Sequence, residues 1–241
     1  MRVPVLTLAL LLAGLAQAEP RALNFSVIEG WAMPLAQMED GRLTGGILYE
    51  LFNATAREVG MPPAFHYLPR ARVEQAMREG NVDVRCYVTP SWVNQDLPGF
   101  RWSVPLLTQR DLLVTRTSSA VNVADLSGQN VGTVLGYHYP QLQAAFEAGR
   151  LRRDDARTQE LVLKKLEAGR YRYAVSSEVA LDWFNLRQPP EHRLYPVAQL
   201  DQTELACMVL DAPTLPTQAV LDALARLKAS GEVERILDHY R

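Results

Sequence analysis

The chain has 241 residues, with 25 basic and 27 acidic side chains and a formal net charge of −2. Binding to nucleic acid needs a clustered basic face, so this balance argues against a nucleic-acid partner. The length suits one large domain or two lobes of roughly 100 residues each. Length and charge therefore indicate a globular protein that does not bind nucleic acid.

Strands and helices are predicted to alternate along almost the whole chain, which is typical of a mainly parallel sheet flanked by helices. In chain order we expect a strand at 23–28, a helix at 46–59, a strand at 64–67, a helix at 72–79 and a strand at 82–88. These are followed by a strand at 111–116, a short helix at 123–126, a strand at 130–134, and helices at 140–147 and 159–168. The chain ends with a strand at 171–176, a helix at 178–186, a strand at 205–210, and helices at 215–229 and 232–240.

One unit of helix, glycine and strand occurs twice in the chain. Residues 75–80 lead into the β-rich run 82–88, and residues 165–169 lead into 171–176. In each unit a glycine closes the helix, where it tolerates the left-handed conformation that a helix end often needs. Two such units far apart predict two similar α/β lobes that face each other across a ligand-binding cleft.

Ligands of mainly parallel sheets lie beyond the carboxyl ends of the strands. The site is therefore expected in the segments that directly follow strands, at 29–33, 89–92, 136–139 and 176–178.

The first 18 residues have the pattern of a secretory signal peptide. Arg2 supplies a positive charge, 5–13 is an apolar run, and 16–18 (Ala-Gln-Ala) has the small-x-small form of a cleavage site. Cleavage after Ala18 removes Arg2 and leaves 223 residues with a net charge of −3. The apolar run is too short to span a bilayer. Because Glu19 rather than Cys follows the cut, we expect an exported protein that is neither membrane-embedded nor a lipoprotein.

The two cysteines, Cys86 and Cys207, each lie in an apolar β-rich run. In an exported protein such a pair can form a disulfide, but a buried free thiol is also common in such runs, and both interpretations stay open. Two cysteines and four scattered histidines show no metal-ligand spacing, so we expect no metal and no other cofactor.

Basic side chains gather at 150–157, where acidic ones are interleaved with them. Mixed charge of this kind is typical of an exposed face, so we expect a solvated helix-and-loop surface here rather than an anion site.

Several segments, in order and spacing, are similar to the motifs of one family. Residues 45–51 (Gly-Gly-Ile-Leu-Tyr-Glu-Leu) resemble a Gly-Phe-x-x-Asp-Leu entry to the first helix, and 79–84 precede 101–106, which resemble Asp-Phe-Ser-x-Pro-Tyr. Residues 123–132 resemble Leu-x-Asp-Leu-x-Gly-Lys-x-Val-Gly, and 224–240 resemble a closing helix pair with Ala-Leu-x-x-Leu-x-x-x-Gly. Over nearly the whole mature chain the sequence thus resembles a divergent member of the family 3 periplasmic solute-binding proteins, typified by receptors for polar amino acids.

The resemblance implies an α/β, two-lobe periplasmic-binding-protein fold of type II. Each lobe would be a mainly parallel sheet flanked by helices, and two hinge strands would join the lobes. Lobe 1 would contain 19–107 and 204–241, and lobe 2 would contain 108–203, with hinge crossings near 108–110 and 202–203. Binding in the family closes the lobes around the ligand by a hinge motion.

In the first lobe, the resemblance places Trp92 of the segment Thr89–Trp92 where the family has an arginine that holds the ligand carboxylate. A substitute cation would then be needed, because guanidinium suits bidentate binding of a carboxylate. We favour Arg72, with Arg70 and Arg101 as alternatives, although both helix-start arginines also fit a solvent-facing position. Expected contacts from this lobe are the ring of Trp31 and the group Tyr87, Thr89, Ser91 and Trp92.

In the second lobe, the segment Gly136, Tyr137, His138 and Tyr139 follows a strand and opens a helix, whose unpaired N–H groups suit an anion. By the resemblance, Glu178 occupies the position of the acid that pairs with the ligand amine. Ser177 and Glu178 equally fit an ordinary helix start, in which Ser caps and Glu suits the dipole.

The resemblance implies a non-catalytic periplasmic protein, expected to be a monomer. It would capture a small polar solute, an amino acid or a related molecule, and deliver it to the inner-membrane permease of an ABC-type transporter. One alternative is a ligand-sensing module for a signalling receptor. The other is a dehydratase-like enzyme on the same fold, for which Glu178 and His138 are the only plausible acid–base groups.

Overall fold

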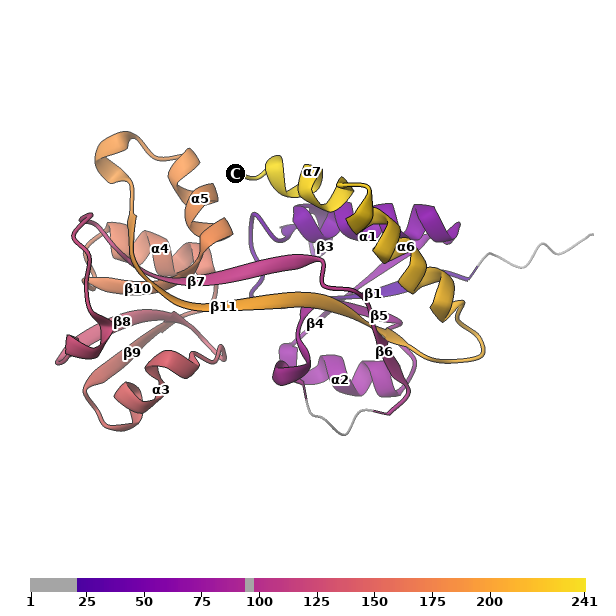
Figure 1. The fold of residues 1–241 in the computed structure, drawn as a ribbon, viewed down its shortest axis with the longest axis horizontal. Coiled ribbons are helices and arrows are strands. Elements are labelled where there is room, and N and C mark those ends of the chain that lie inside the picture. The colour runs from indigo at the N-terminus through magenta and orange to yellow at the C-terminus, as the bar shows by residue number, and fades with distance from the viewer. Residues whose placement is uncertain (1–20, 94–97) are drawn as a thin grey trace, which may run out of the picture.

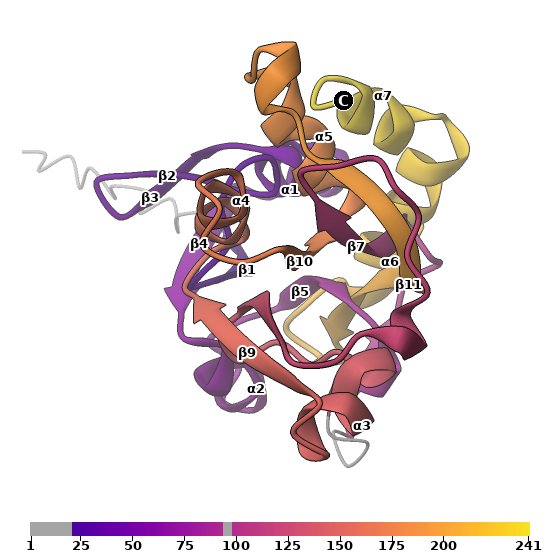
Figure 2. The same ribbon diagram turned by 90° about the vertical axis from the view of Figure 1, so that its left-hand side faces the viewer.

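The computed structural model describes residues 21–93 and 98–241. Two α/β lobes lie side by side and are joined by a pair of long strands (Figure 1). Figure 2 shows the molecule from the side of the second lobe. None of the helices in the described residues combines the length and hydrophobicity that a membrane crossing needs. The signal peptide expected at 1–18 lies outside the described residues.

The first lobe is built on parallel strands in the order β4–β1–β5. Its strands are β1 (Leu23–Ile28), β4 (Pro63–Leu68), β5 (Val84–Val88) and β6 (Phe100–Trp102). Its helices are α1 (Ile47–Val59), α2 (Arg70–Arg78), α6 (Thr217–Ala229) and α7 (Glu232–Asp238). A hairpin of β2 (Gln37–Glu39) and β3 (Arg42–Gly45) precedes α1, and a short 3₁₀ turn, η1 (Pro90–Trp92), follows β5.

The second lobe repeats this plan, with parallel strands in the order β10–β8–β9. Its strands are β8 (Gln129–Val134), β9 (Leu151–Ala156) and β10 (Tyr173–Ser177). Its helices are α3 (Pro140–Glu147), α4 (Gln159–Glu167) and α5 (Glu178–Leu186), with 3₁₀ turns η2 (Val123–Asp125) and η3 (Pro190–His192). The repeated unit of helix, glycine and strand is thus α2–β5 in one lobe and α4–β10 in the other.

The connection between the lobes consists of β7 (Leu107–Thr115) and β11 (Tyr195–Leu210). They pair antiparallel from Leu107 opposite Leu205 to Thr115 opposite Tyr195. At one end β11 pairs with β5 and β6, and at the other end β7 pairs with β10. Both lobes are therefore attached to one continuous two-stranded ribbon.

Each lobe has its own hydrophobic core, and the two lie at opposite ends of this ribbon. The first combines residues from 23–107 with residues from 205–233, and includes the stacked rings of Phe25 and Phe52, whose centroids are 4.5 Å apart. The second lobe has buried clusters of its own, built from residues between 112 and 197. Because the first core needs both chain segments, the C-terminal helices complete a lobe that the N-terminal part begins.

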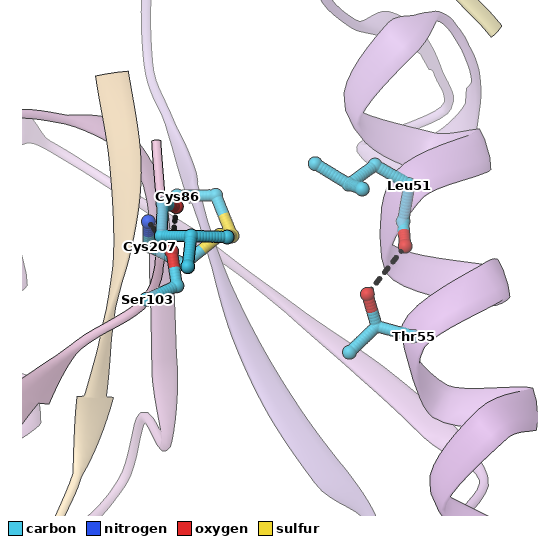
Figure 3. Close-up of a disulfide and its surroundings, with 6 residues drawn as sticks. Leu51, Thr55, Cys86, Ser103 and Cys207 are labelled. Carbon is cyan, nitrogen blue, oxygen red and sulfur yellow. Dashed lines mark hydrogen bonds between the residues drawn. A yellow bond between two sulfur atoms is a disulfide. The ribbon is translucent and has the colours of Figure 1, made fainter. Parts of the chain in front are cut away.

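Cys86 on β5 and Cys207 on β11 form a buried disulfide that links positions 121 residues apart. Figure 3 shows the bridge opposite Leu51 and Thr55 of α1. The backbone N–H of Cys207 donates to Ser103 Oγ at 2.9 Å. The disulfide therefore joins the two chain segments from which the first lobe is built.

Some elements differ from the sequence-based expectation. Residues 151–156 are the edge strand β9 rather than helix and loop. An edge strand exposes polar side chains between buried ends, here Leu151 and Ala156, and such a run lacks the apolar signal of a central strand. The strand expected at 205–210 is the end of β11, whose first part is too polar to be recognised, and β2, β3 and β6 were not expected.

Candidate functional site

A cavity of about 250 Å³ lies between the lobes, beside the joining ribbon. Residues of both lobes and of β7 line it: Ile28, Trp31, Arg70, Arg85, Tyr87, Ser91, Trp92, Gln109, Asp111, Tyr137, His138 and Tyr139. Many of these residues lie just beyond the ends of β1, β5 and β8, as expected for a sheet of this type.

A bulge in β5 places Tyr87 in the cavity wall. Cys86 lies opposite Cys207 and Val88 opposite Ala206, so Tyr87 is the extra residue without a partner. Its φ of 58° is left-handed, a conformation that costs a non-glycine residue roughly 1–2 kcal/mol. Bulges are frequent beside functional sites because they redirect a side chain. The redirected ring lies edge-on to Trp31, with centroids 6.2 Å apart.

Arg85, also on β5, is a buried cation with unused hydrogen-bonding capacity. Its side chain is 3% exposed, and Nε and Nη1 have no hydrogen-bond partner among the described residues. The nearest carboxylate oxygen, Glu74 Oε1 on α2, is 3.6 Å from Nη1, beyond hydrogen-bond distance. Burial, and then the charge of Arg70, lower the pKa of Arg85 to about 10, so it remains charged at neutral pH.

The wall from the second lobe is the segment between β8 and α3, which carries Tyr137, His138 and Tyr139. Arg153 of β9 holds this segment: Nη1 donates to the Tyr137 carbonyl and Nη2 to the Val134 carbonyl, each at 3.0 Å. The guanidinium also lies 5.4 Å from the centre of the Tyr139 ring. The N–H of Val134 donates to the Tyr139 hydroxyl at 3.0 Å. The cavity-facing aromatic side chains therefore have a fixed backbone beneath them.

The lobes touch each other at the cavity. Arg70, the first residue of α2, places its guanidinium 5.5 Å from the ring centre of Tyr137 in the second lobe. Burial raises the pKa of the Tyr137 hydroxyl, against the opposing effects of Arg70 and of a hydrogen bond with Trp31. A cation–π contact contributes about 0.5–2 kcal/mol. The contact of Arg70 with Tyr137 is therefore one point at which the two lobes meet beside the cavity.

Asp111, in the middle of β7, is a carboxylate in the wall that the joining ribbon provides. Gln109 Nε2 donates to its Oδ1 at 2.8 Å. Burial raises the pKa of Asp111 to about 6, and the negative charge of Asp201, directly opposite on β11, adds to the increase. Arg70, Arg85 and Asp111 thus give the cavity both signs of charge.

Most of the aromatic residues expected in the site line the cavity. They are Trp31, Tyr87, Trp92, Tyr137 and Tyr139, and Ser91 and His138 accompany them. Ser177 borders a smaller space next to it. Thr89, which is buried just after β5, and Gly136, which is exposed, do not line the cavity.

Arg72, which the sequence favoured as the cation of the site, does not line this cavity. Arg72 is exposed and contacts Gln75 of its own helix at 3.3 Å. Positions two apart on a helix point in different directions, so Arg70 reaches the cavity when Arg72 does not. Arg101, the other alternative, is exposed and bonds to Gln218 at 2.7 Å.

Glu178, which the resemblance places at the ligand amine, is paired within the protein. Its Oε2 accepts a hydrogen bond from Arg110 Nη1 at 2.7 Å, and it lies outside the cavity lining. The side chain of Ser177 makes no capping hydrogen bond to α5. The carboxylate that faces the cavity is instead Asp111, which sequence reasoning missed.

Arg85 and Gln109 were missed as well. A signal for Arg85 was available, because a charged residue between Val84 and Cys86 interrupts an otherwise apolar run. Asp111 and Gln109 gave no such signal, since they lie within the joining ribbon rather than after a strand. Within the described residues, no cluster of His, Cys, Asp and Glu has the arrangement of a metal site.

The fold is shared with many solved structures. An ancestral arginine-binding protein bound to arginine has a TM-score of 0.72 and 19% identity, over 91% of this chain and 97% of the other. A histidine kinase sensor domain with similarity to periplasmic binding proteins has a TM-score of 0.71 and 21% identity, over 92% and 96%. The VFT2 domain of BvgS from Bordetella pertussis, as a double mutant, has a TM-score of 0.71 and 17% identity, over 91% of this chain and 93% of the other.

The chain has the two-lobe periplasmic-binding-protein fold. No family profile matches the sequence, and no curated protein is significantly similar to it. At these identities the likeness establishes the fold, and the chemistry of the cavity comes from this chain's own residues.

Proposed function

We propose that this protein is a non-catalytic binding protein that captures a small polar solute between its lobes. The observation that carries the proposal is a cavity between the lobes that is lined by two ionisable groups, the buried Arg85 and the half-buried Asp111. Burying charge is unfavourable unless a partner compensates, so this cavity is better explained by a polar ligand than by packing alone.

Closure is proposed to occur by bending of the joining ribbon near 108–110 and 202–203. Lobe 1 would then contain 19–107 and 204–241, and lobe 2 would contain 108–203. The hydrophobic cores support this division, because the core of each lobe lies at a different end of the ribbon. A ligand that contacts both lobes favours the closed state by the contacts that only this state offers.

The biological setting is proposed from the sequence and the neighbours together. The signal-peptide pattern supports export to the periplasm. The similar fold of the substrate-binding protein of an amino acid ABC transporter supports transport, in which the protein delivers an amino acid or related solute to an ABC-type permease. The histidine kinase sensor domain favours a second role, in which closure is read by a signalling partner. An enzyme is disfavoured because Glu178 is paired with Arg110 and does not line the cavity that His138 lines.

A thermal-shift screen tests the binding function. Mature protein is heated with amino acids, polyamines, small carboxylates or sugars, each over a range of concentrations. At a hundredfold excess over Kd, a ligand of the folded state adds about 2.7 kcal/mol of stability and raises Tm by about 5–10 °C for a chain of this size. We expect at least one class to give a saturable increase. If no class raises Tm or changes tryptophan fluorescence, the binding function is contradicted.

A further inference from the structure

We propose that the cavity selects small aromatic carboxylates and that Arg85 receives the carboxylate. The proposal rests on the binding function above and adds the chemical class of the ligand. It also assigns a specificity-determining role to a residue at a position where the family resemblance places no ligand contact.

Among the described residues, Arg85 forms an ion pair with Glu74 but lacks a hydrogen-bond acceptor for two of its buried nitrogens. Nε and Nη1 are buried without hydrogen-bond partners among the described residues, and Glu74 is 3.6 Å away, with 28% of its own side chain exposed. Leaving a buried donor without a hydrogen-bond acceptor is unfavourable, and more so when the donor is charged. A carboxylate has two acceptor oxygens and a negative charge, so it would satisfy this guanidinium better than water or a neutral amide.

The cavity lining carries an excess of positive charge. Arg70 faces the cavity from α2, and its charge is one of the causes that lower the pKa of Arg85. Among the described residues that line the cavity, Asp111 is the one carboxylate, against the two guanidinium groups of Arg70 and Arg85. A monoanion therefore improves the electrostatics of the cavity, whereas a cation meets two guanidinium groups.

The walls favour a flat ring on the ligand. Trp31 and Tyr87 meet edge to face on one side, and Tyr137 and Tyr139 form the opposite side from the second lobe. The volume of about 250 Å³ is below the roughly 300–1,000 Å³ of pockets for drug-sized molecules. The space therefore suits one ring with a short substituent.

The α-amino group of an ordinary amino acid has no dedicated partner at the expected position. Trp92 occupies the place where the family has its carboxylate-binding arginine, and Glu178 is paired with Arg110 at 2.7 Å outside the cavity. Asp111 is the carboxylate of the lining that an ammonium group could reach, and it shares the cavity with the guanidinium groups of Arg70 and Arg85. The anion and the ring are therefore the features on which the proposal rests.

The test is a calorimetric titration of the mature protein with benzoate, benzamide and acetate. Benzamide has the ring without the charge, and acetate has the charge without the ring. We expect benzoate to bind at least tenfold more tightly than either. The Arg85→Gln variant should lose at least tenfold in benzoate affinity and little in benzamide affinity. Arg72→Gln, whose guanidinium lies outside the cavity, is the matched control and should bind benzoate as the wild type does.

A thermal melt of each variant shows that it is folded. If Arg85→Gln does not fold, Arg70→Gln replaces it, and the same preferential loss of benzoate affinity is expected. Equal affinity of the wild type for benzoate and benzamide, or no benzoate binding, would overturn the assignment. Undiminished benzoate binding by Arg85→Gln would also overturn it. If benzoate fails while another class succeeds in the thermal-shift screen, the binding function stands and this inference alone is wrong.

Discussion

At the residue scale, the site depends on ionisable groups that the fold withdraws from water. Arg85 and Asp111 are both held where burial disfavours their charged forms, as the directions of their pKa shifts indicate. Such groups cluster at functional sites because a ligand can supply the compensation that solvent no longer gives. The unligated protein therefore carries a stability cost at this cavity.

Asp111 makes that cost depend on pH. Its pKa rises from 3.8 to about 6 on folding, so between these values the folded state binds more protons than the unfolded state. The stability contribution is highest below pH 3.8 and is lost as the pH rises through 6. This loss in the free energy of unfolding is about 3 kcal/mol, because a shift of one pKa unit is equivalent to roughly 1.36 kcal/mol.

Replacing Asp111 by Asn removes this titration and keeps an oxygen that can accept from Gln109. We expect the unligated Asp111→Asn variant to be more stable than the wild type at pH 7.5, with the difference shrinking toward pH 4. Urea unfolding at both pH values measures it, because the midpoint and slope give the free energy of unfolding. The same difference at pH 4 and pH 7.5 would be evidence against a buried, proton-binding Asp111.

At the element scale, β5 carries both cavity side chains and the disulfide. Arg85 and Tyr87 line the cavity, and Cys86 between them forms a disulfide with Cys207 on the neighbouring strand β11. The bulge at Tyr87 and the disulfide at Cys86 occur at neighbouring positions of the same strand pair. The disulfide therefore anchors the strand segment that presents the ligand-contacting residues.

We expect the double variant Cys86→Ala, Cys207→Ala to lose about 2–5 kcal/mol of stability, the usual effect of removing a native disulfide. Ligand affinity should also fall, because the covalent link between β5 and β11 is removed and only their backbone pairing remains. Denaturant unfolding and a titration with the ligand found in the thermal-shift screen measure the two effects. A variant with unchanged stability would show that the bridge does not support the first lobe.

Much of the fold was accessible from the sequence, because apolar periodicity and helix-ending glycines mark most helices and central strands. α3 and α5 begin and end where they were expected, at 140–147 and 178–186. The edge strand β9 was missed because its middle positions are charged. Much of the first half of β11 was missed because many of its side chains there are polar, so the sequence lacks the apolar pattern that marks a strand.

The candidate site was harder to predict than the fold. Residues that follow strands, such as Trp31 and Tyr137, were found because parallel sheets place such segments together. Arg70 and Arg72 could not be separated, since the choice depends on how α2 is rotated toward the second lobe. Asp111 was invisible because its exposure to the cavity arises only when the lobes meet over β7.

At the scale of the whole molecule, the lobes meet in more than one place. At the cavity, the guanidinium of Arg70 lies over the ring of Tyr137. Elsewhere, Trp183 of α5 in the second lobe packs against Tyr240, which follows α7 in the first lobe, with ring centroids 5.7 Å apart. Figure 1 shows these helices next to each other, with the C-terminus between them. Contacts of this size are modest, so ligand binding can control whether the lobes open or close.

The most direct test of ligand-driven closure is a distance measured between the lobes by electron spin resonance. Spin labels are placed on cysteines introduced at the exposed positions Arg78 of α2 and Glu147 of α3, under non-reducing conditions that preserve the native disulfide. With the ligand found in the thermal-shift screen, we predict a shift from a broad, longer distance distribution to a shorter, narrower one. An identical distribution with and without saturating ligand would contradict the account.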